Sequence, residues 1–214
     1  MVLPLTPIRF KRRAERIFGK KVGVVCDDLR LTYHEFNQRC DRLSHALLKL
    51  GVNPGERVAY LSFNCHRLLE AYYGIPQIGA ILLPLNIRLT SEELAYIFKN
   101  SIPSILFFDP EFTSVVESLR QETTSVRHYI ALNRPAGLLA RWAHERVYDD
   151  LLDQAEPREI DYRTVDENSI AELFYTSGTT AYPKGVMLTH RNLYLHALYT
   201  AIALRCSDAE VSLY

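Results

Sequence analysis

The chain has 214 residues, and its 25 Lys and Arg are balanced by 25 Asp and Glu, so the formal net charge is zero at pH 7. A hydrophobic content of 48% is ordinary for a globular domain, and the zero net charge argues against a nucleic acid or a strongly acidic partner. No apolar run approaches the length that would cross a bilayer and no secretory signal opens the chain, so we expect a cytoplasmic protein without a transmembrane segment.

A basic cluster comes first along the chain. It consists of Arg9, Lys11, Arg12, Arg13 and Arg16. Glu15 interrupts the cluster, and no apolar core of a signal follows it. We therefore interpret the cluster as the solvated face of a helix. Peripheral contact with anionic lipid, or part of a transit peptide, is the alternative interpretation.

Strands and helices alternate in the first half of the sequence. We expect strands at residues 22–26, 57–63 and 80–83, and helices from residue 33 to about 50 and near 66–78. Thr32 with Glu35, and Thr90 with Glu93, have the spacing of capping boxes, so each pair predicts the start of a helix. Gly51 is the expected stop of the helix that begins after Thr32.

The alternation continues to residue 154. We expect strands at residues 104–108 and 128–132, and helices around 112–119 and 147–154. Strands that alternate with helices predict right-handed crossovers and a mostly parallel sheet flanked by helices on both faces, so the expected fold class is α/β. A polar segment at 156–169 suggests a crossing between an N-terminal α/β unit, 1–155, and the start of a second α/β unit, 170–214.

The most informative stretch is residues 173–193, which read LFYTSGTTAYPKGVMLTHRNL. An apolar run leads into small, hydroxyl-rich residues, then into a lysine between proline and glycine, and then into a helical pattern. Hydroxyl groups and backbone N–H groups of a small-residue loop can point at one anion, and Lys184 adds a full charge. The common phosphate loop of nucleotide hydrolases does not fit, because Pro183 stands where that loop needs glycine. An ordinary Ser/Thr turn between a strand and a helix is the alternative.

Residue for residue, this stretch resembles the phosphate-binding loop of the AMP-forming adenylating enzymes, which include acyl-CoA synthetases, luciferases and the adenylation domains of peptide synthetases. The resemblance extends upstream through Leu31-Thr32-Tyr33, Gly55-Glu56-Arg57 and Pro84-Leu85-Asn86. The Pro-Leu-Asn form favours the branch that activates fatty or related carboxylic acids. One position departs from the pattern, since Ala181 stands where the family usually has glycine, and we expect negative φ there.

The resemblance implies a reaction and a set of binding residues. A carboxylate attacks the α-phosphate of MgATP, pyrophosphate leaves, and the acyl group passes from the adenylate to coenzyme A. The residues implied to enfold the β- and γ-phosphates are Thr176, Ser177, Gly178, Thr179 and Thr180, with Lys184 neutralising them. Thr176 is also the candidate ligand for Mg²⁺, with a strand-end threonine bonded to backbone as its alternative role.

Other polar residues near these motifs receive structural roles. Asn86 and Arg88 are interpreted as loop and cap residues, and His190 and His196 as packed or solvated histidines on the helix after the loop. No segment resembles the family's downstream glutamate motif, its ribose-binding acid or its catalytic lysine. We therefore expect the N-terminal part of a longer synthetase, inactive alone and able to form homo-oligomers. A non-catalytic remnant or interaction module, or an adenylating enzyme for an aryl or amino acid, stays open.

Overall fold

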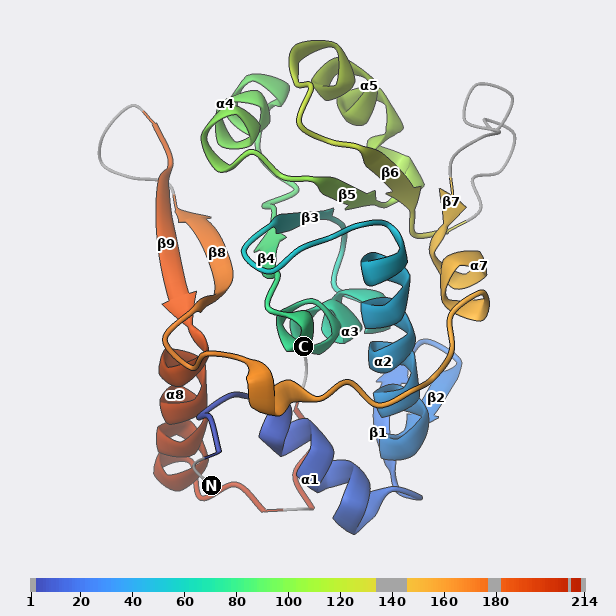
Figure 1. Cartoon of the computed structure of the whole chain (residues 1–214), viewed down its shortest axis with the longest axis vertical. Helices are drawn as coiled ribbons and strands as arrows, with labels where there is room; N and C mark the ends of the chain where they lie inside the picture. The colour runs from blue at the N-terminus through green and yellow to red at the C-terminus, as the bar shows by residue number, and fades with distance from the viewer. Residues whose placement is uncertain (1–2, 134–145, 177–181, 208, 213–214) are drawn as a thin grey trace.

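The computed structural model describes residues 3–133, 146–176, 182–207 and 209–212 (Figure 1). Within these ranges a seven-stranded sheet forms the centre of the molecule. Its strands are β3 (Arg57–Leu61), β4 (Ile81–Pro84), β5 (Ile105–Phe108), β6 (His128–Ala131), β7 (Arg146–Val147), β8 (Ile170–Thr176) and β9 (Lys184–Thr189). Their order is β7-β6-β5-β3-β4-β8-β9, and every neighbouring pair is parallel except the antiparallel β8 and β9. The predicted α/β class is confirmed.

Helices cover both faces of this sheet. The helices are α1 (Ile8–Phe18), α2 (Tyr33–Lys49), α3 (His66–Gly74), α4 (Ser91–Ser101), α5 (Thr113–Glu122), α7 (Tyr148–Asp153) and α8 (His190–Ala203), with short 3₁₀ turns at Pro76–Ile78, Pro110–Phe112 and Tyr162–Thr164. Helices α2, α3 and α7 share one hydrophobic core with the sheet, and α4 and α5 share a second core on the opposite face. A parallel sheet buried on both faces explains why its strands read as almost continuous apolar runs.

Strand β3 shows how alternation builds the two cores. Val58 and Tyr60 point into the core under α2 and α3, whereas Ala59 and Leu61 point into the core under α4 and α5. Strands β4 and β5 alternate in the same way and pair with β3 in parallel register. Adjacent side chains of a strand face opposite ways, so one short strand can contribute to both cores.

Local capping chemistry sets the starts of two helices as predicted. The backbone N–H of Glu35 donates to Thr32 Oγ1 at 3.2 Å, and the N–H of Thr32 donates back to the Glu35 carboxylate at 2.7 Å. Thr90 and Glu93 form the same reciprocal pair at the start of α4. Helix α2 ends at Lys49, and Gly51 takes positive φ (76°), which suits a residue without Cβ.

The sheet differs from the sequence prediction at its beginning. Strands β1 (Val22–Cys26) and β2 (Leu29–Thr32) form a separate antiparallel ladder rather than the first strand of the main sheet. They are joined through a turn at Asp27, which has positive φ. Two strands joined by so short a connection pair in antiparallel fashion, and this pair has no partner strand in the main sheet. The predicted division into two units around 156–169 stays a prediction, and β8 pairs with β4 of the preceding sheet.

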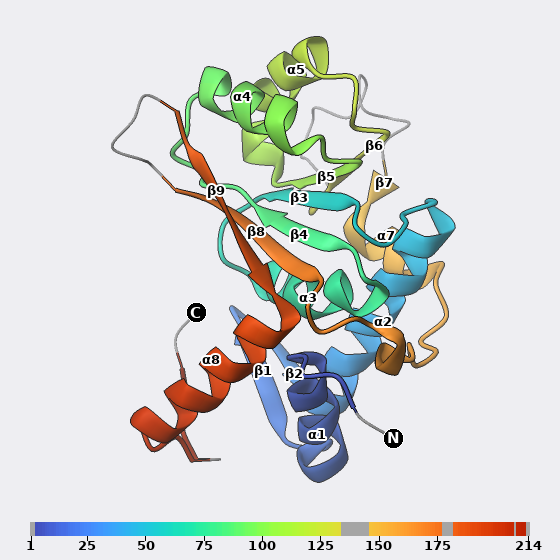
Figure 2. The ribbon, with the colours of Figure 1, turned by 60° about the vertical axis from the view of Figure 1, so that its left-hand side comes forward.

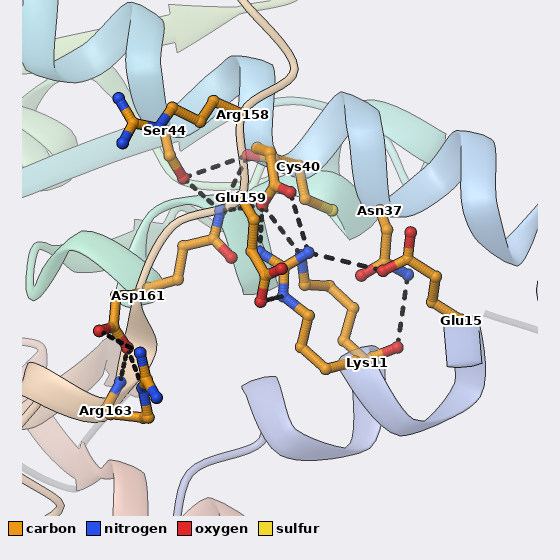
Figure 3. A network of polar contacts seen from close by, with 12 residues as sticks. Lys11, Glu15, Asn37, Cys40, Ser44, Arg158, Glu159, Asp161 and Arg163 are labelled. Atoms are coloured by element: carbon orange, nitrogen blue, oxygen red, sulfur yellow. Dashed lines mark hydrogen bonds and ion pairs between the residues drawn. The ribbon is translucent and has the colours of Figure 1, made fainter. Parts of the chain in front are cut away.

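The basic cluster on α1 is only partly solvated, which corrects the sequence interpretation. Arg13 and Arg16 are exposed as expected, but Lys11 is 4% exposed and lies against α2. Lys11 Nζ lies 3.4 Å from Asp41 Oδ1, and the Arg12 guanidinium contacts both oxygens of Asp41 at 2.7 and 2.9 Å. Figure 3 shows Lys11 beside Asn37, whose side-chain amide donates to the Lys11 carbonyl at 3.3 Å. The Asp41 carboxylate on α2 lies beside the Lys11 ammonium group and compensates its charge, which makes the burial of Lys11 tolerable.

The same network reaches the turn after α3. Gln77 Nε2 donates to Asp41 Oδ1 at 3.0 Å and to Ser44 Oγ at 2.5 Å. Ser44 Oγ donates in turn to the Gly74 carbonyl at 2.5 Å. Buried polar groups are costly unless they are hydrogen-bonded, and here they bond to one another across three elements. The network thereby fixes α1 against α2 and the end of α3.

Helix α8 leaves the end of β9 and points away from the sheet (Figure 2). Thr189 caps it through a reciprocal pair with Asn192. Its apolar side chains are largely open to solvent, and Tyr199 and Ile202 are 71% and 77% exposed. Met187 on β9 is 63% exposed as well. The β9–α8 region therefore presents several exposed apolar side chains close together in the sequence.

Candidate functional site

The phosphate-loop motif lies at the loop end of the β8–β9 hairpin. Thr176 is the last residue of β8, Lys184 is the first of β9, and the two are paired in the antiparallel register. Both are exposed, and no carboxylate among the described residues forms an ion pair with Lys184. Its ammonium group is therefore available to an anion. Ser177, Gly178, Thr179 and Thr180, together with Ala181, lie outside the described residues.

A strand separates the loop from the helix that follows it, contrary to the helical pattern expected directly after the loop. Residues Lys184–Thr189 pair with β8 as β9, and α8 begins only at His190. Pairing with β8 gives the backbone N–H and C=O groups of this short segment their hydrogen-bond partners. The helical propensity of the segment does not provide such partners. The predicted helix is correct in existence and begins later than the pattern suggested.

A cavity of about 540 Å³ opens at the same edge of the sheet. The lining comes from the carboxyl ends of β3, β4 and β8 and the residues that follow β3 and β4, together with two side chains of α3: Ser62, Phe63, Asn64, Pro84, Leu85, Asn86, Ile87, Arg88, Phe174 and Tyr175, and Leu68 and Tyr72. Ligands of open α/β sheets bind at the carboxyl ends of the strands, where the loops diverge. Tyr175 of the cavity lining is the neighbour of Thr176 on β8, so we treat the cavity and the Thr176–Lys184 pair as one candidate region.

Most of the cavity residues were not identified as site residues from the sequence. Each of Ser62, Phe63 and Tyr175 comes at or just after the carboxyl end of a predicted strand, and this position is the signal that could have found them. Asn86 does have the predicted loop role, because its Oδ1 accepts from the Arg88 backbone N–H at 3.0 Å. The Arg88 side chain is exposed at the cavity and has no ion pair within the described ranges.

Asp109 stabilises the cavity from the neighbouring strand. One of its carboxylate oxygens accepts from the Phe63 backbone N–H at 2.9 Å, just after β3. Burial raises the pKa of Asp109, and the hydrogen bond from Phe63 acts in the opposite direction. This contact joins the ends of β3 and β5 and fixes the backbone that forms the cavity wall.

Glu172 is a buried carboxyl group on the strand that leads to the loop. It is 7% exposed, and burial alone raises its pKa to about 7. Leu173 and Tyr175 pack toward the α4–α5 core, so alternation along β8 places Glu172 on the other face, near Tyr73 of α3. Sequence reasoning missed it, although a lone acid between apolar residues of a buried strand is a visible signal.

The two histidines of α8 have the structural roles that the sequence predicted. His190 is fully buried, and its Nδ1 lies 2.9 Å from Thr6 Oγ1. Burial lowers the pKa of His190 to about 4, so the ring is neutral near pH 7. His196 is exposed on the next turns of the helix. Neither histidine lines the cavity at the carboxyl edge of the sheet.

Comparison with known proteins agrees with the geometry. A family model described as AMP-binding enzyme matches residues 10–213. The long-chain-fatty-acid–CoA ligase of Thermus thermophilus is 39% identical over 199 residues, covering 90% of this chain and 35% of that protein. The peroxisomal butyrate–CoA ligase of Arabidopsis thaliana is 31% identical over 209 residues, covering 94% of this chain and 36% of that protein.

A solved structure shows the same fold. The anthranilate CoA ligase AuaEII, in complex with anthranoyl-AMP, has a TM-score of 0.84 at 23% identity over 92% of this chain and 37% of that one. The present chain thus spans about a third of the length of these relatives. Of the helices in the described ranges, none combines the length and apolarity needed to span a membrane. With a family match over nearly all of its length and the fold of the N-terminal part of adenylate-forming ligases, this chain belongs to the AMP-binding enzyme family.

Proposed function

We propose that the protein containing this chain uses MgATP to convert a fatty or related carboxylic acid into an acyl-adenylate and then into acyl-CoA. The observation that carries the proposal is the pairing of Thr176 with Lys184 at the loop end of the hairpin, where the adjacent Tyr175 lines the cavity at the carboxyl edge of the sheet. Adenylation is largely a matter of positioning reactants and neutralising charge. A hydroxyl group and an ammonium group that forms no ion pair with a described residue suit that task.

The residues of the loop have distinct proposed roles. Thr176, Ser177, Gly178, Thr179 and Thr180 hold the β- and γ-phosphates, and Lys184 neutralises the departing pyrophosphate. The exposed hydroxyl of Thr176 is also a suitable oxygen ligand for Mg²⁺, which usually keeps several waters and takes few protein ligands in nucleotide sites. The metal would supply further neutralisation of phosphate charge.

The class of acid is a finer part of the proposal. The relatives named above act on long-chain fatty acids, butyrate and anthranilate by their descriptions, so family membership alone does not choose among acids. The Pro84-Leu85-Asn86 sequence supports a fatty or related acid, as the sequence resemblance implied. We further propose a cytoplasmic enzyme and self-association through the exposed apolar side chains of β9 and α8.

We also propose that this segment alone does not form acyl-CoA. The chain spans about a third of its relatives, and its described residues supply one side of a nucleotide site without an identified partner for adenine or ribose. Adenylation needs several groups to meet the transition state at once. Phosphate contacts alone therefore do not assemble the reaction.

The test uses the full-length protein with MgATP, coenzyme A and a panel of fatty, aromatic and amino acids. The readouts are ATP–pyrophosphate exchange for adenylation and AMP release with thioester formation for the complete reaction. We expect both with a fatty acid. Exchange with an aromatic or amino acid only would reassign the substrate class. No exchange with any acid would support a non-catalytic remnant or interaction module instead.

A further inference from the structure

One helix contacts the chain on both sides of the phosphate loop. Tyr96 and Asn100 of α4 are four residues apart and so share one face of the helix. The Tyr96 ring stacks on Tyr182, just after the loop, with ring centroids 4.8 Å apart and planes inclined by 24°. Just before the loop, the Tyr175 hydroxyl donates to Asn100 Oδ1. The two flanks of the loop thus rest on adjacent turns of α4.

The environment of Tyr175 makes this contact specific. Burial raises the pKa of its hydroxyl and Tyr96 raises it further, while the hydroxyl itself donates to Asn100, so two residues of α4 act on this one group. The ring also crosses Gly185, its partner on β9. A Cβ at Gly185 would lie only 3.4 Å from Tyr175 Cζ and 3.3 Å from Leu173 Cδ1. The approach to Leu173 would be tight and that to Tyr175 an ordinary van der Waals contact, so the Tyr175 ring packs directly over Gly185.

Helix α4 is itself firmly fixed to the sheet. Its Leu94, Ile97 and Phe98 are buried in the core under α4 and α5. Arg57 of β3 donates from Nε to the Ser101 carbonyl at 2.5 Å and from its terminal nitrogen to the Ile102 carbonyl at 2.7 Å. These bonds satisfy carbonyls that the last turn of a helix leaves free. The position of α4 is thereby tied to the central strand of the sheet.

We infer that Tyr96 and Asn100 are positioning residues that set where Thr176 and Lys184 stand relative to the cavity. The inference rests on the proposed function for its catalytic consequence, whereas the structural coupling between α4 and the hairpin stands independently of it. The hairpin is the outermost part of the sheet, since β9 has no further neighbour among the described strands. Without contacts to α4, its loop end would be held chiefly by the bonds between β8 and β9.

The test uses the full-length protein and five substitutions. Tyr96→Ala removes the stack, Tyr182→Ala removes it from the exposed side, and Asn100→Ala removes the acceptor for Tyr175. Tyr96→Phe keeps the ring and should restore the parent behaviour. Lys99→Ala is the matched control, because Lys99 is also on α4 but pairs with Glu122 at 3.3 Å on the surface.

We expect the three truncating variants to raise the KM for MgATP with little change in the KM for the acid. A misplacement of about 1 Å can cost roughly a hundredfold in rate, so we expect kcat/KM for MgATP to fall between about tenfold and a hundredfold. Amide hydrogen exchange without nucleotide should quicken at the β8–β9 hairpin in these variants and stay unchanged in Tyr96→Phe and Lys99→Ala.

The two readouts separate this inference from the proposed function. If the parent protein shows no adenylation, the proposed function fails, but hydrogen exchange still decides whether α4 holds the hairpin. If amide hydrogen exchange at the hairpin and kcat/KM for MgATP are both unchanged in Tyr96→Ala and Tyr182→Ala, the inference is overturned. Because Tyr182 is 63% exposed, its replacement keeps the test usable if Tyr96→Ala does not fold. Altered amide hydrogen exchange at the hairpin together with an unchanged KM for MgATP would also reject the positioning role.

Discussion

Thr6 Oγ1 and His190 Nδ1 lie 2.9 Å apart, although 184 positions separate the two residues in the chain. The contact joins the segment before α1 to the first turn of α8. The other ring nitrogen, Nε2, is buried without a hydrogen-bond partner in the described part of the chain. A proton added there would place a positive charge in a site that offers it no compensating hydrogen bond. The folded protein therefore favours the neutral ring.

This burial makes stability depend on pH. The pKa of His190 is lowered to about 4 in the folded state, whereas an unfolded chain has a value near 6.5. As pH falls through about 6.5, the unfolded state takes up the proton first, so stability is lost between about pH 6.5 and 4. The full effect is about 3 kcal/mol by the conversion of pKa differences to free energy. His190→Gln should remove this part of the pH dependence.

Urea unfolding at a series of pH values measures the effect as a difference between parent and variant. The difference is needed because Glu172, with a pKa raised to about 7, acts in the opposite sense: its folded form takes up a proton first as pH falls. His66, whose pKa is lowered to about 4, is common to both proteins. His196→Gln, an exposed change on the same helix, should follow the parent. Parallel curves for His190→Gln and the parent would contradict the prediction.

A second prediction concerns Lys184. Its ammonium group is exposed and has no ion pair with a described residue, so it contributes little to folding. Beside a departing pyrophosphate it would stabilise charge that develops in the transition state. We expect Lys184→Ala in the full-length protein to slow ATP–pyrophosphate exchange about a hundredfold to a thousandfold, with little change in melting temperature. The control is Lys20→Ala, an exposed lysine remote from the loop. Equal exchange rates would remove Lys184 from the mechanism.

Local sequence signals predicted much of the fold because they act over a few residues. Thr90 and Glu93 are three positions apart, and their reciprocal hydrogen bonds form as soon as the helix does. The run at residues 104–108 is apolar enough to indicate a buried strand in any context. Strand β9 was missed because its stability comes from pairing with β8 rather than from its own composition. The strand at residues 22–26 was assigned to the main sheet because the sequence of a single strand does not indicate which sheet it joins.

The site was predicted in part for the same reason. The motif around Thr176 and Lys184 is contiguous in sequence and could be read directly. The contacts of Tyr96 with Tyr182 and of Asn100 with Tyr175 join α4 to a hairpin far along the chain, so only the fold brings them together. The fold class and the loop motif could therefore be predicted from the sequence. The contacts of α4 that hold the flanks of the loop could not, because they depend on tertiary packing.

The last prediction concerns Asp41, which the basic cluster of α1 requires. Its carboxylate accepts from Lys11, Arg12 and Gln77, and it is 3% exposed. Burial lowers the pKa of Lys11, while nearby Cys40 and Asp41 act in the opposite direction. Asp41→Ala would leave a buried ammonium group and a half-buried guanidinium without their carboxylate. Breaking a buried ion pair in this way typically costs about 3–5 kcal/mol.

Urea unfolding of Asp41→Ala and Asp41→Asn should therefore show a large loss in the first and a smaller loss in the second, because asparagine keeps an oxygen acceptor. Without Asp41, the buried Lys11 favours its neutral form, and forcing that form costs less as pH rises toward the ordinary lysine pKa. The deficit of Asp41→Ala should accordingly narrow between pH 7 and pH 10. Asp28→Ala, a change at an exposed aspartate in the turn between β1 and β2, is the control and should match the parent. A deficit below about 1 kcal/mol in Asp41→Ala, in the range of surface ion pairs, would mean that α1 packs against α2 through its apolar contacts alone.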